Sequence, residues 1–242
     1  MKRIYVLLFI CCLFILTGCG KRNSNELIMV TEAGFAPYEY YENSEVVGVD
    51  VDIAREIAKE MGTTLVIKDI AFDSIINEVK TGKADFGAAG ISYSEERAKN
   101  VDFSINYAVS KQVVIVKNDS SITDINSIGN KKIAVQLGSV ADTFVTDEYD
   151  EATIVRQKKY LAAIEDLKVS KVDCVVMDEL PAKEIVNSNT GIKILNGALT
   201  NDSYGMVVKK GNKELLEVIN KVLNRLSSDG SIDRYIIAHT EK

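Results

Sequence analysis

The stretch from Gly90 to Asn100, GISYSEERAKN, puts an arginine close to small polar groups and two glutamates. The guanidinium of Arg97 can bind a carboxylate through two parallel hydrogen bonds, and Ser92 can add a hydroxyl and a backbone N–H. A helix that starts near SYSEER, with Ser92 or Ser94 as its N-cap, would add the positive end of its dipole. Together these groups predict a clamp for a carboxylate. The fragment alone equally allows Arg97 to pair with a neighbouring acid on a solvated surface.

A second charged residue of interest, Asp178, ends the apolar run VDCVVMD at 172–178. A zwitterion taken from water needs both of its charges paired, because an unpaired buried charge costs several kcal/mol. Arg97 and Asp178 would supply the two opposite charges that such a ligand requires. Asp178 could also serve as the N-cap of a helix that begins at ELPAKEIV.

The elements that must position these groups alternate between short apolar strands and amphipathic helices. In the segment Asp52–Met61, Ile53 and Ile57 lie four residues apart on one helical stripe, and Gly62 is placed to cap the helix. Further helices are expected over 72–82, 139–148, 160–169, 180–187 and 212–226, and strands over 27–31, 64–68, 84–90, 112–117, 132–136, 172–177 and 204–209. This alternation predicts an α/β fold with largely parallel sheets, and the number of elements suits two lobes of about 100 residues each.

In open α/β sheets, ligands bind beyond the carboxyl ends of the strands. The predicted strands place four segments at such ends: 31–35, 88–92, 136–140 and 177–179. We therefore expect the candidate site where these four segments meet.

Five segments resemble, in order and spacing, the solute-binding protein family 3 of bacterial ABC importers. They are TEAGFAPYEY, GVDVDIAREIAKEMG, AFDSIINEVKTGKADFGAAGISYSEERAKNVDFS, AVQLGS and VDCVVMDELPA, and the resemblance runs from Leu27 to the C-terminal helix. It implies a periplasmic-binding-protein-like fold of type II, with two Rossmann-like α/β lobes joined by two hinge strands that close over a free amino acid. We expect lobe 1 at 27–110 plus 204–242 and lobe 2 at 111–203, with crossing strands near 109–113 and 202–205.

The resemblance also implies which residues hold the two charges common to every amino acid. Arg97 and Ser92 match the residues that bind the ligand's α-carboxylate. Gly90 matches a position whose backbone carbonyl accepts a hydrogen bond from the α-ammonium group. Asp178 matches the acid that receives the same ammonium group from the other lobe.

Four further positions match residues around the ligand. Phe35 and Phe72 match two aromatic residues that flank the ligand side chain, whereas without the resemblance both would be expected in the core. Ser139 and Val140 match a loop that donates hydrogen bonds to the carboxylate. Many relatives carry threonine at the position of Val140, so only its backbone N–H could serve in this chain.

Glu32, three residues before Phe35, is the candidate residue for binding the ligand side chain. Basic-amino-acid binders of the family often carry an acid there, so the resemblance implies a polar, cationic ligand of the arginine or lysine type. A surface glutamate is an equally good interpretation of Glu32. Met177, beside Asp178, slightly favours a ligand whose side chain has an apolar stem.

An enzymatic function is not favoured by the residues present. The only histidine, His239, lies in the tail IIAHTEK and is expected to be exposed, and the sequence lacks the common hydrolase, redox, zinc and nucleotide motifs. We expect no cofactor and no metal site. The alternatives are a dehydratase acting on prephenate or arogenate, for which Glu179 is the only candidate general acid, and a surface amino-acid sensor on the same fold.

The 242 residues include 29 basic and 35 acidic side chains, and this balance argues against a nucleic-acid partner. A basic start, an uncharged run from Ile4 to Leu16 and the tetrapeptide LTGC resemble the start of a bacterial lipoprotein. We expect a signal peptide at 1–18, a lipid on Cys19 and a tether at 19–26, with an uncleaved signal anchor as the alternative. Cleavage would move the net charge from −6 to −8 and leave Cys174 as the only internal cysteine, so no internal disulfide is expected.

The same resemblances imply where the protein works and with which partners. We expect a monomer that is lipid-anchored on the outer face of the plasma membrane, or periplasmic in a two-membrane envelope. Its expected partners are a small-molecule amino acid and the permease and ATPase subunits of an ABC importer.

Overall fold

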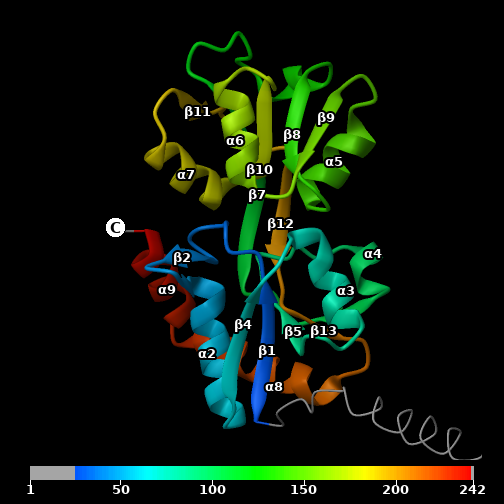
Figure 1. The fold of residues 1–242 in the computed structure, drawn as a ribbon, viewed down its shortest axis with the longest axis vertical. Helices are drawn as coiled ribbons and strands as arrows, with labels where there is room; N and C mark the ends of the chain where they lie inside the picture. The colour runs from blue at the N-terminus through cyan, green and yellow to red at the C-terminus, as the bar shows by residue number, and fades with distance from the viewer. Residues whose placement is uncertain (1–24, 241–242) are drawn as a thin grey trace, which may run out of the picture.

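The computed structural model describes residues 25–240, which carry two mixed sheets, one above the other in Figure 1. The first sheet has the order β4 (Thr64–Asp69), β1 (Glu26–Thr31), β5 (Phe86–Gly87), β13 (Val207–Lys209) and β6 (Val101–Phe103). The second has the order β11 (Ile192–Ile194), β7 (Ala108–Lys117), β10 (Cys174–Asp178), β8 (Lys132–Gln136) and β9 (Thr153–Gln157), and β12 (Thr200–Tyr204) pairs with β7. A small hairpin joins β2 (Tyr40–Glu42) to β3 (Glu45–Val47).

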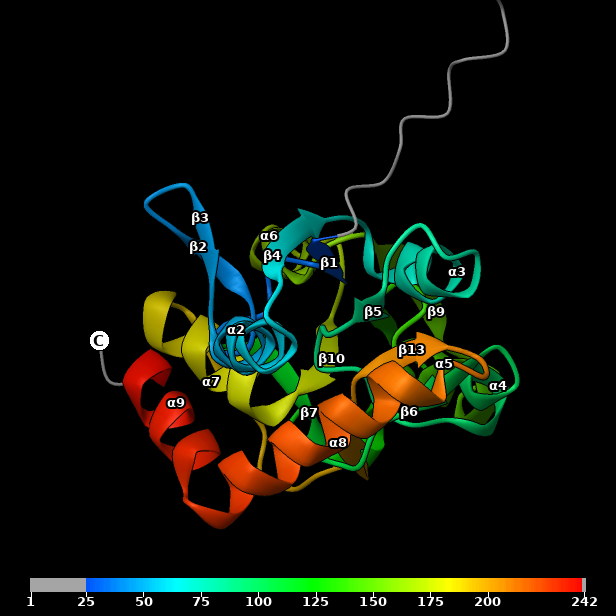
Figure 2. The same ribbon diagram turned by 90° about the horizontal axis from the view of Figure 1, so that it is seen from below.

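Helices cover both faces of the first sheet because its strands are apolar on both sides. In β1, Leu27 and Met29 join the hydrophobic cluster that includes α2 (Val49–Met61) and α8 (Lys213–Ser228). The alternate residues Ile28 and Val30 join the cluster of α3 (Ile75–Lys80), which follows the 3-10 turn η1 (Phe72–Ser74). Figure 2 shows α8 beside α2, with α9 (Ser231–Thr240) following α8. The two-residue period of the strand therefore builds two cores.

The second sheet is covered in the same way. Ile133 and Val135 of β8 pack in the cluster of α5 (Val140–Glu148), together with η2 (Ile125–Ile128). Ala134 faces the cluster that contains α6 (Tyr160–Lys168) and part of α7 (Glu179–Ser188). Parallel pairing of β8 with β9 and β10 places the carboxyl ends of these strands at one edge, toward the first sheet.

Two strands, the long β7 and the shorter β12, run between the two halves of the molecule and pair with each other in antiparallel register. The prediction of two α/β lobes joined by two strands is thus confirmed. The sheets are mixed rather than largely parallel, because β13 and β7 run antiparallel to their neighbours. The chain passes from the first sheet to the second at 104–107, between β6 and β7, and returns at 205–206, between β12 and β13; the predicted division into lobes stays a prediction.

The C-terminal segment differs from the expectation of an exposed tail. Residues Ser231–Thr240 form α9, and the His239 side chain is only 12% exposed. Its two ring nitrogens lie 2.9 Å from the Tyr40 hydroxyl and 2.9 Å from the Asp52 carboxylate. The histidine therefore ties α9 to the β2–β3 hairpin and to α2.

The signal peptide, Cys19 and most of the tether lie outside the described residues, and β1 already begins at Glu26. Across 25–240, none of the helices combines the length and the apolar character that a membrane crossing requires.

Candidate functional site

All nine predicted binding residues line one narrow, tightly closed cavity between the two lobes. Lobe 1 contributes the ends of β1 and β5 and the turns that follow them, and lobe 2 contributes the carboxyl ends of β8 and β10. The residues predicted from sequence are Glu32, Phe35, Phe72, Gly90, Ser92, Arg97, Ser139, Val140 and Asp178. Four others, not expected from sequence, complete the lining: Glu39, Ala89, Gln136 and Tyr160.

Arg97 spans the two lobes at one end of the cavity. Its guanidinium donates to the carbonyl oxygen of Ser92 at 2.6 Å and to that of Gly138, on the other lobe, at 2.9 Å. The guanidinium carbon lies 5.4 Å from the centre of the Phe72 ring, a cation–π distance. Burial lowers the pKa of Arg97, while the charges of Asp178 and Asp202 raise it, and the group stays protonated. The arginine is therefore a fixed positive charge that faces the cavity rather than a surface ion-pair partner.

The helix expected near Arg97 is present and short. It is α4 (Glu95–Ala98), a single turn whose N-cap is Ser94, and the Ser94 hydroxyl accepts from the Arg97 backbone N–H at 3.2 Å. Ser92 is not the cap; it forms an isolated bridge with Tyr204 of β12. A single turn has little dipole, so the positive character of this end comes from the Arg97 side chain.

The start of α5 faces the same cavity from lobe 2. Ser139 is its N-cap, and the Ser139 hydroxyl accepts from the Asp142 backbone N–H at 3.1 Å. The first N–H groups of a helix have no partner within the helix, so those beginning at Val140 can donate to an anion.

Asp178 lies buried at the opposite side of the cavity, at the end of β10. Its carboxylate accepts from the Ser110 hydroxyl at 2.7 Å and from the Tyr204 hydroxyl at 2.5 Å, and these residues belong to the two crossing strands. Asp178 occupies the N-cap position of α7 but makes no capping hydrogen bond. Burial raises the pKa of Asp178, although its hydrogen bonds oppose that shift. The acid thus points toward the cavity and the hinge, not toward its own helix.

Aromatic rings pack around the cavity from both lobes. The Phe35 ring stacks on Tyr160 of lobe 2, with ring centres 5.8 Å apart and planes 24° from parallel. Gly90 adopts a positive φ of 54°, and a Cβ there would lie 2.7 Å from the Phe35 ring. Glycine is therefore required at position 90 both for its backbone conformation and for the approach of this ring.

Glu32 is buried, with 1% of its surface exposed, which excludes the interpretation as a surface glutamate. One carboxylate oxygen lies 2.9 Å from the Lys159 ammonium, and the other accepts from the Gln136 amide at 3.0 Å. Lys159 and Gln136 both belong to lobe 2. The carboxylate that was expected to face the ligand side chain is thus also bound by the opposite lobe.

Glu39 is the main site residue that sequence reasoning missed. It is fully buried beside Asp50, and neither of its carboxylate oxygens makes a well-formed hydrogen bond within residues 25–240, although Asp50 is near enough to share a proton with it. Burial and the charge of Asp50 raise the pKa of Glu39 well above its usual value. Burial also raises the pKa of Asp50 to about 6, while the nearby Tyr107 hydroxyl and the hydrogen bond from the Gly90 N–H act to lower it.

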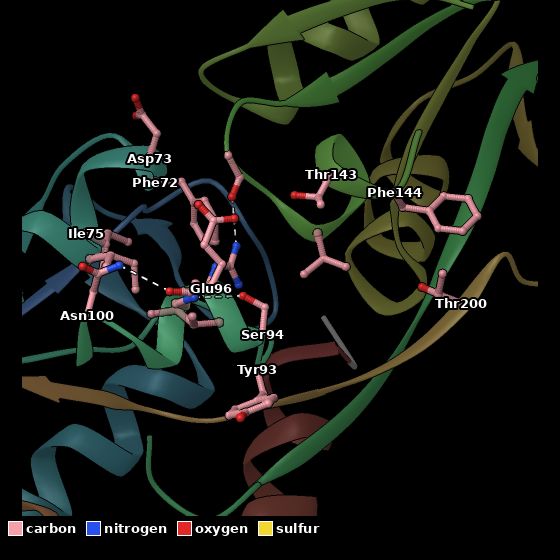
Figure 3. A pocket seen from close by; sticks show the side chains of 15 residues that line it. Phe72, Asp73, Ile75, Tyr93, Ser94, Glu96, Asn100, Thr143, Phe144 and Thr200 are labelled. Carbon is pink, nitrogen blue, oxygen red and sulfur yellow. Dashed lines mark hydrogen bonds between the residues drawn. The ribbon is translucent and has the colours of Figure 1, made fainter. Parts of the chain in front are cut away.

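A second, larger and more open groove continues outward from the Arg97 end (Figure 3). Phe72 and Ile75 lie on one side of it, and Phe144 and Thr200 lie on the other. Arg97 lines both this groove and the inner cavity. Of the two, only the inner cavity is lined by buried acids, Glu32, Glu39 and Asp178, so we place the candidate site there.

The structure gives little support to an enzymatic or metal-binding role. The Lys183 ammonium lies 2.8 Å from Glu179 and lowers the pKa of that carboxyl, the opposite of what a general acid needs. Cys174 is a buried free thiol whose pKa burial raises to about 12. Within residues 25–240, no cluster of three metal-ligating side chains occurs.

Two α/β lobes with a charged cavity between them define a two-lobed binding protein, and comparison with known proteins gives its family. The family "Bacterial extracellular solute-binding proteins, family 3" matches residues 27–239. The chain belongs to this family, as the sequence predicted, and its type II periplasmic-binding-protein fold is confirmed. The relatives are solute-binding proteins of transporters rather than enzymes.

Three relatives illustrate the similarity. The chain is 28% identical to the "Arginine-binding extracellular protein ArtP" of Bacillus subtilis, over 97% of this chain and 96% of that protein. A crystal structure of a mutant of ArgBP from T. maritima has 36% identity and a TM-score of 0.86, covering 90% and 96% of the two chains. The substrate-binding protein AbpA from Streptococcus pneumoniae, solved bound to L-arginine, has 33% identity and a TM-score of 0.84, covering 88% and 93%.

Proposed function

We propose that this protein captures a free cationic amino acid of the arginine type by closing its lobes, and delivers it to the permease of an ABC importer. The cavity observed between the lobes has the charges that such a ligand needs. The names of several relatives, which are arginine-binding proteins, support the same ligand class.

One observation carries the choice of a cationic ligand. Three buried acids, Glu32, Glu39 and Asp178, line the cavity, against two cations: Arg97 within it and Lys159, which pairs with Glu32. A neutral amino acid brings one negative and one positive charge, so it leaves the surplus of acids unchanged. A side chain with its own positive charge reduces that surplus, and buried carboxylates are stable only when they are paired or protonated.

The α-carboxylate and α-ammonium groups of the ligand would occupy the two ends of the Arg97–Asp178 axis. Arg97, Ser92 and the N–H groups at Ser139 and Val140 would hold the carboxylate. Asp178, together with the Gly90 carbonyl, would hold the ammonium group. Because Arg97 and Asp178 stand on different lobes, one ligand that contacts both stabilises the closed conformation over the open one.

The ligand side chain would run between Phe35 and Phe72 toward the acids on lobe 1. The two rings suit the apolar stem of arginine, and the carboxyl groups of Glu39 and Glu32 suit its guanidinium. Glu39 is the better placed of the two acids for this contact, because its oxygens are not already held by lobe 2.

We further propose that the protein is a lipoprotein without enzymatic activity. A lipid on Cys19 and a tether up to residue 26 would keep the lobes near the outer membrane surface, beside the permease and ATPase subunits. The lipobox-like sequence LTGC supports this anchor, and the lowered pKa of Glu179 speaks against a dehydratase.

A thermal-shift screen against the twenty amino acids plus ornithine, citrulline and cystine tests the ligand class. A ligand present at a hundred times its dissociation constant stabilises the folded state by about 2.7 kcal/mol, which corresponds to a shift of several degrees at this size. We expect large shifts with arginine and its cationic analogues and smaller ones with citrulline. A shift with neutral amino acids alone would overturn the cationic assignment, and no shift with any amino acid would overturn the proposed function.

A further inference from the structure

A short segment of lobe 2, residues 158–160, contacts the side-chain end of the cavity at three successive positions. The Lys158 carbonyl oxygen accepts from the Gln136 amide at 3.0 Å, and the same amide donates to Glu32. The Lys159 ammonium lies 2.9 Å from Glu32, and the Tyr160 ring stacks on Phe35. Glu32 and Phe35 belong to the loop after β1 in lobe 1, so we name residues 158–160 the interlobe clasp.

Lys159 is the charged member of the clasp. It also lies 3.5 Å from Asp69, at the end of β4, so two acids of lobe 1 share one cation of lobe 2. Asp69 is itself held in place, because it accepts from the Ala33 backbone N–H at 2.8 Å and from the Tyr41 hydroxyl at 3.2 Å. Burial alone would lower the pKa of Lys159, but the hydrogen bonds and charges of Glu32 and Asp69 outweigh it and raise that pKa. Lys159 is therefore a firmly protonated counter-ion.

The two partners differ in exposure. The Glu32 side chain is 2% exposed and needs a positive neighbour, whereas Lys159 is 45% exposed and can swing into water. When the lobes separate, Lys159 can be solvated, and Glu32 regains access to water. The ion pair is therefore made mainly in the closed conformation, which is the condition for a contact to shift the conformational equilibrium.

We propose that Lys159 acts as the protein's own counter-ion for Glu32. This ion pair favours closure whatever ligand is bound and keeps Glu32 from binding the ligand side chain. This inference rests on the proposed function for its effect on ligands, but its effect on closure does not depend on ligand identity. It predicts that selectivity for a positive side chain is set by Glu39, and that removal of Lys159 frees Glu32 to attract such a side chain.

The test compares Lys159→Met with the neighbouring control Lys158→Met, which removes the same charge from an exposed side chain and leaves the backbone carbonyl in place. Dissociation constants for arginine and for its neutral isostere citrulline are measured by titration calorimetry. We expect Lys159→Met to weaken citrulline binding about fivefold, because a half-exposed ion pair with a buried partner is lost. Arginine binding should weaken less, so that the preference for arginine over citrulline rises at least about threefold. Equal constants for the two variants with both ligands would overturn the proposal.

A second measurement does not need a ligand. Spin labels at two exposed positions, Glu217 on α8 and Glu151 on lobe 2, report the distance between the lobes by pulsed electron paramagnetic resonance. In protein dialysed free of amino acids, Lys159→Met should shift the distances to longer values than Lys158→Met does. Identical distributions would refute the clasp even if arginine binds, and failure of every amino acid to bind would refute the proposed function while this measurement still decides the clasp. Thermal unfolding of each variant confirms that both remain folded.

Discussion

Glu39→Gln is the substitution that most directly tests the choice of ligand. Glutamine keeps the size of the side chain and removes its charge, and residue 39 is buried, so the solvent cannot compensate. We expect this variant to bind arginine more weakly and to bind citrulline about as well as the unchanged protein does, because an amide can still hydrogen-bond to the urea group of citrulline.

The magnitude follows from two opposing contributions. Loss of one partner of a buried charge pair costs about 3–5 kcal/mol. In the unchanged protein, however, Glu39 must first lose a proton, and burial and the charge of Asp50 raise its pKa well above the usual value, which offsets part of that cost. We therefore expect a net loss of about 2–3 kcal/mol, which weakens arginine binding about 30- to 150-fold.

Titration calorimetry in buffers with different ionisation enthalpies measures both the affinity and the protons released. Arginine should release a fraction of a proton from the unchanged protein at pH 7, and none from Glu39→Gln, because the cation displaces the proton held by the acidic pair. The exposed Glu45→Gln is the matched control and should behave like the unchanged protein. Arginine binding within about twofold of the unchanged value, with the same proton release, would refute the role of Glu39.

Three further results are expected. Arg97→Lys should weaken the binding of every amino acid about 10- to 100-fold, because the bidentate contact with the carboxylate is lost. Binding of argininamide, which lacks the carboxylate, should weaken far less, and titration calorimetry measures both. Gly90→Ala should lower the melting temperature in scanning calorimetry by several degrees, because the methyl group meets the Phe35 ring and φ is positive. Asp50 stabilises the fold most below its unfolded pKa near 3.8, and this contribution is lost as pH rises through about 6. Asp50→Asn should therefore flatten the decline of the melting temperature between pH 4 and 7, and a parallel decline in both proteins would contradict the assignment.

Sequence patterns predicted the parts of the fold that depend on local periodicity. The apolar stripe of α2 and the left-handed Gly62 that ends it were both recognisable, and Gly62 indeed has a φ of 66°. The strand expected over 84–90 is ordered as a strand only at Phe86–Gly87, because the left-handed conformation of Gly90 turns the chain toward the cavity. The helix α9 was missed because SIDRYIIAHT buries little more than Ile232 and shows no long apolar stripe.

The candidate site was predictable wherever it depended on the ends of strands. The carboxyl ends of β1, β5, β8 and β10 meet at one cavity, so their polar residues converge although they are far apart in sequence. Glu39 was missed because a tight turn folds it back: the Phe35 N–H donates to the Glu39 carbonyl at 2.8 Å. The contact of Lys159 with Glu32 depends on the angle between the lobes, which no local pattern encodes.

The charges of the closed cavity can be balanced one by one. Lys159 pairs with Glu32, the ligand's ammonium group would pair with Asp178, and a cationic side chain would pair with Glu39. A neutral ligand leaves Glu39 without a cation, but the raised pKa of this acid lets it keep its proton, so the cost is small at low pH. As pH rises, Glu39 loses its proton. The neutral ligand must then bind beside a buried, unpaired carboxylate, which weakens its binding. The preference for arginine over citrulline should therefore widen with pH in the unchanged protein and stay constant in Glu39→Gln, and a constant preference in both would show that the acid pair does not select the ligand.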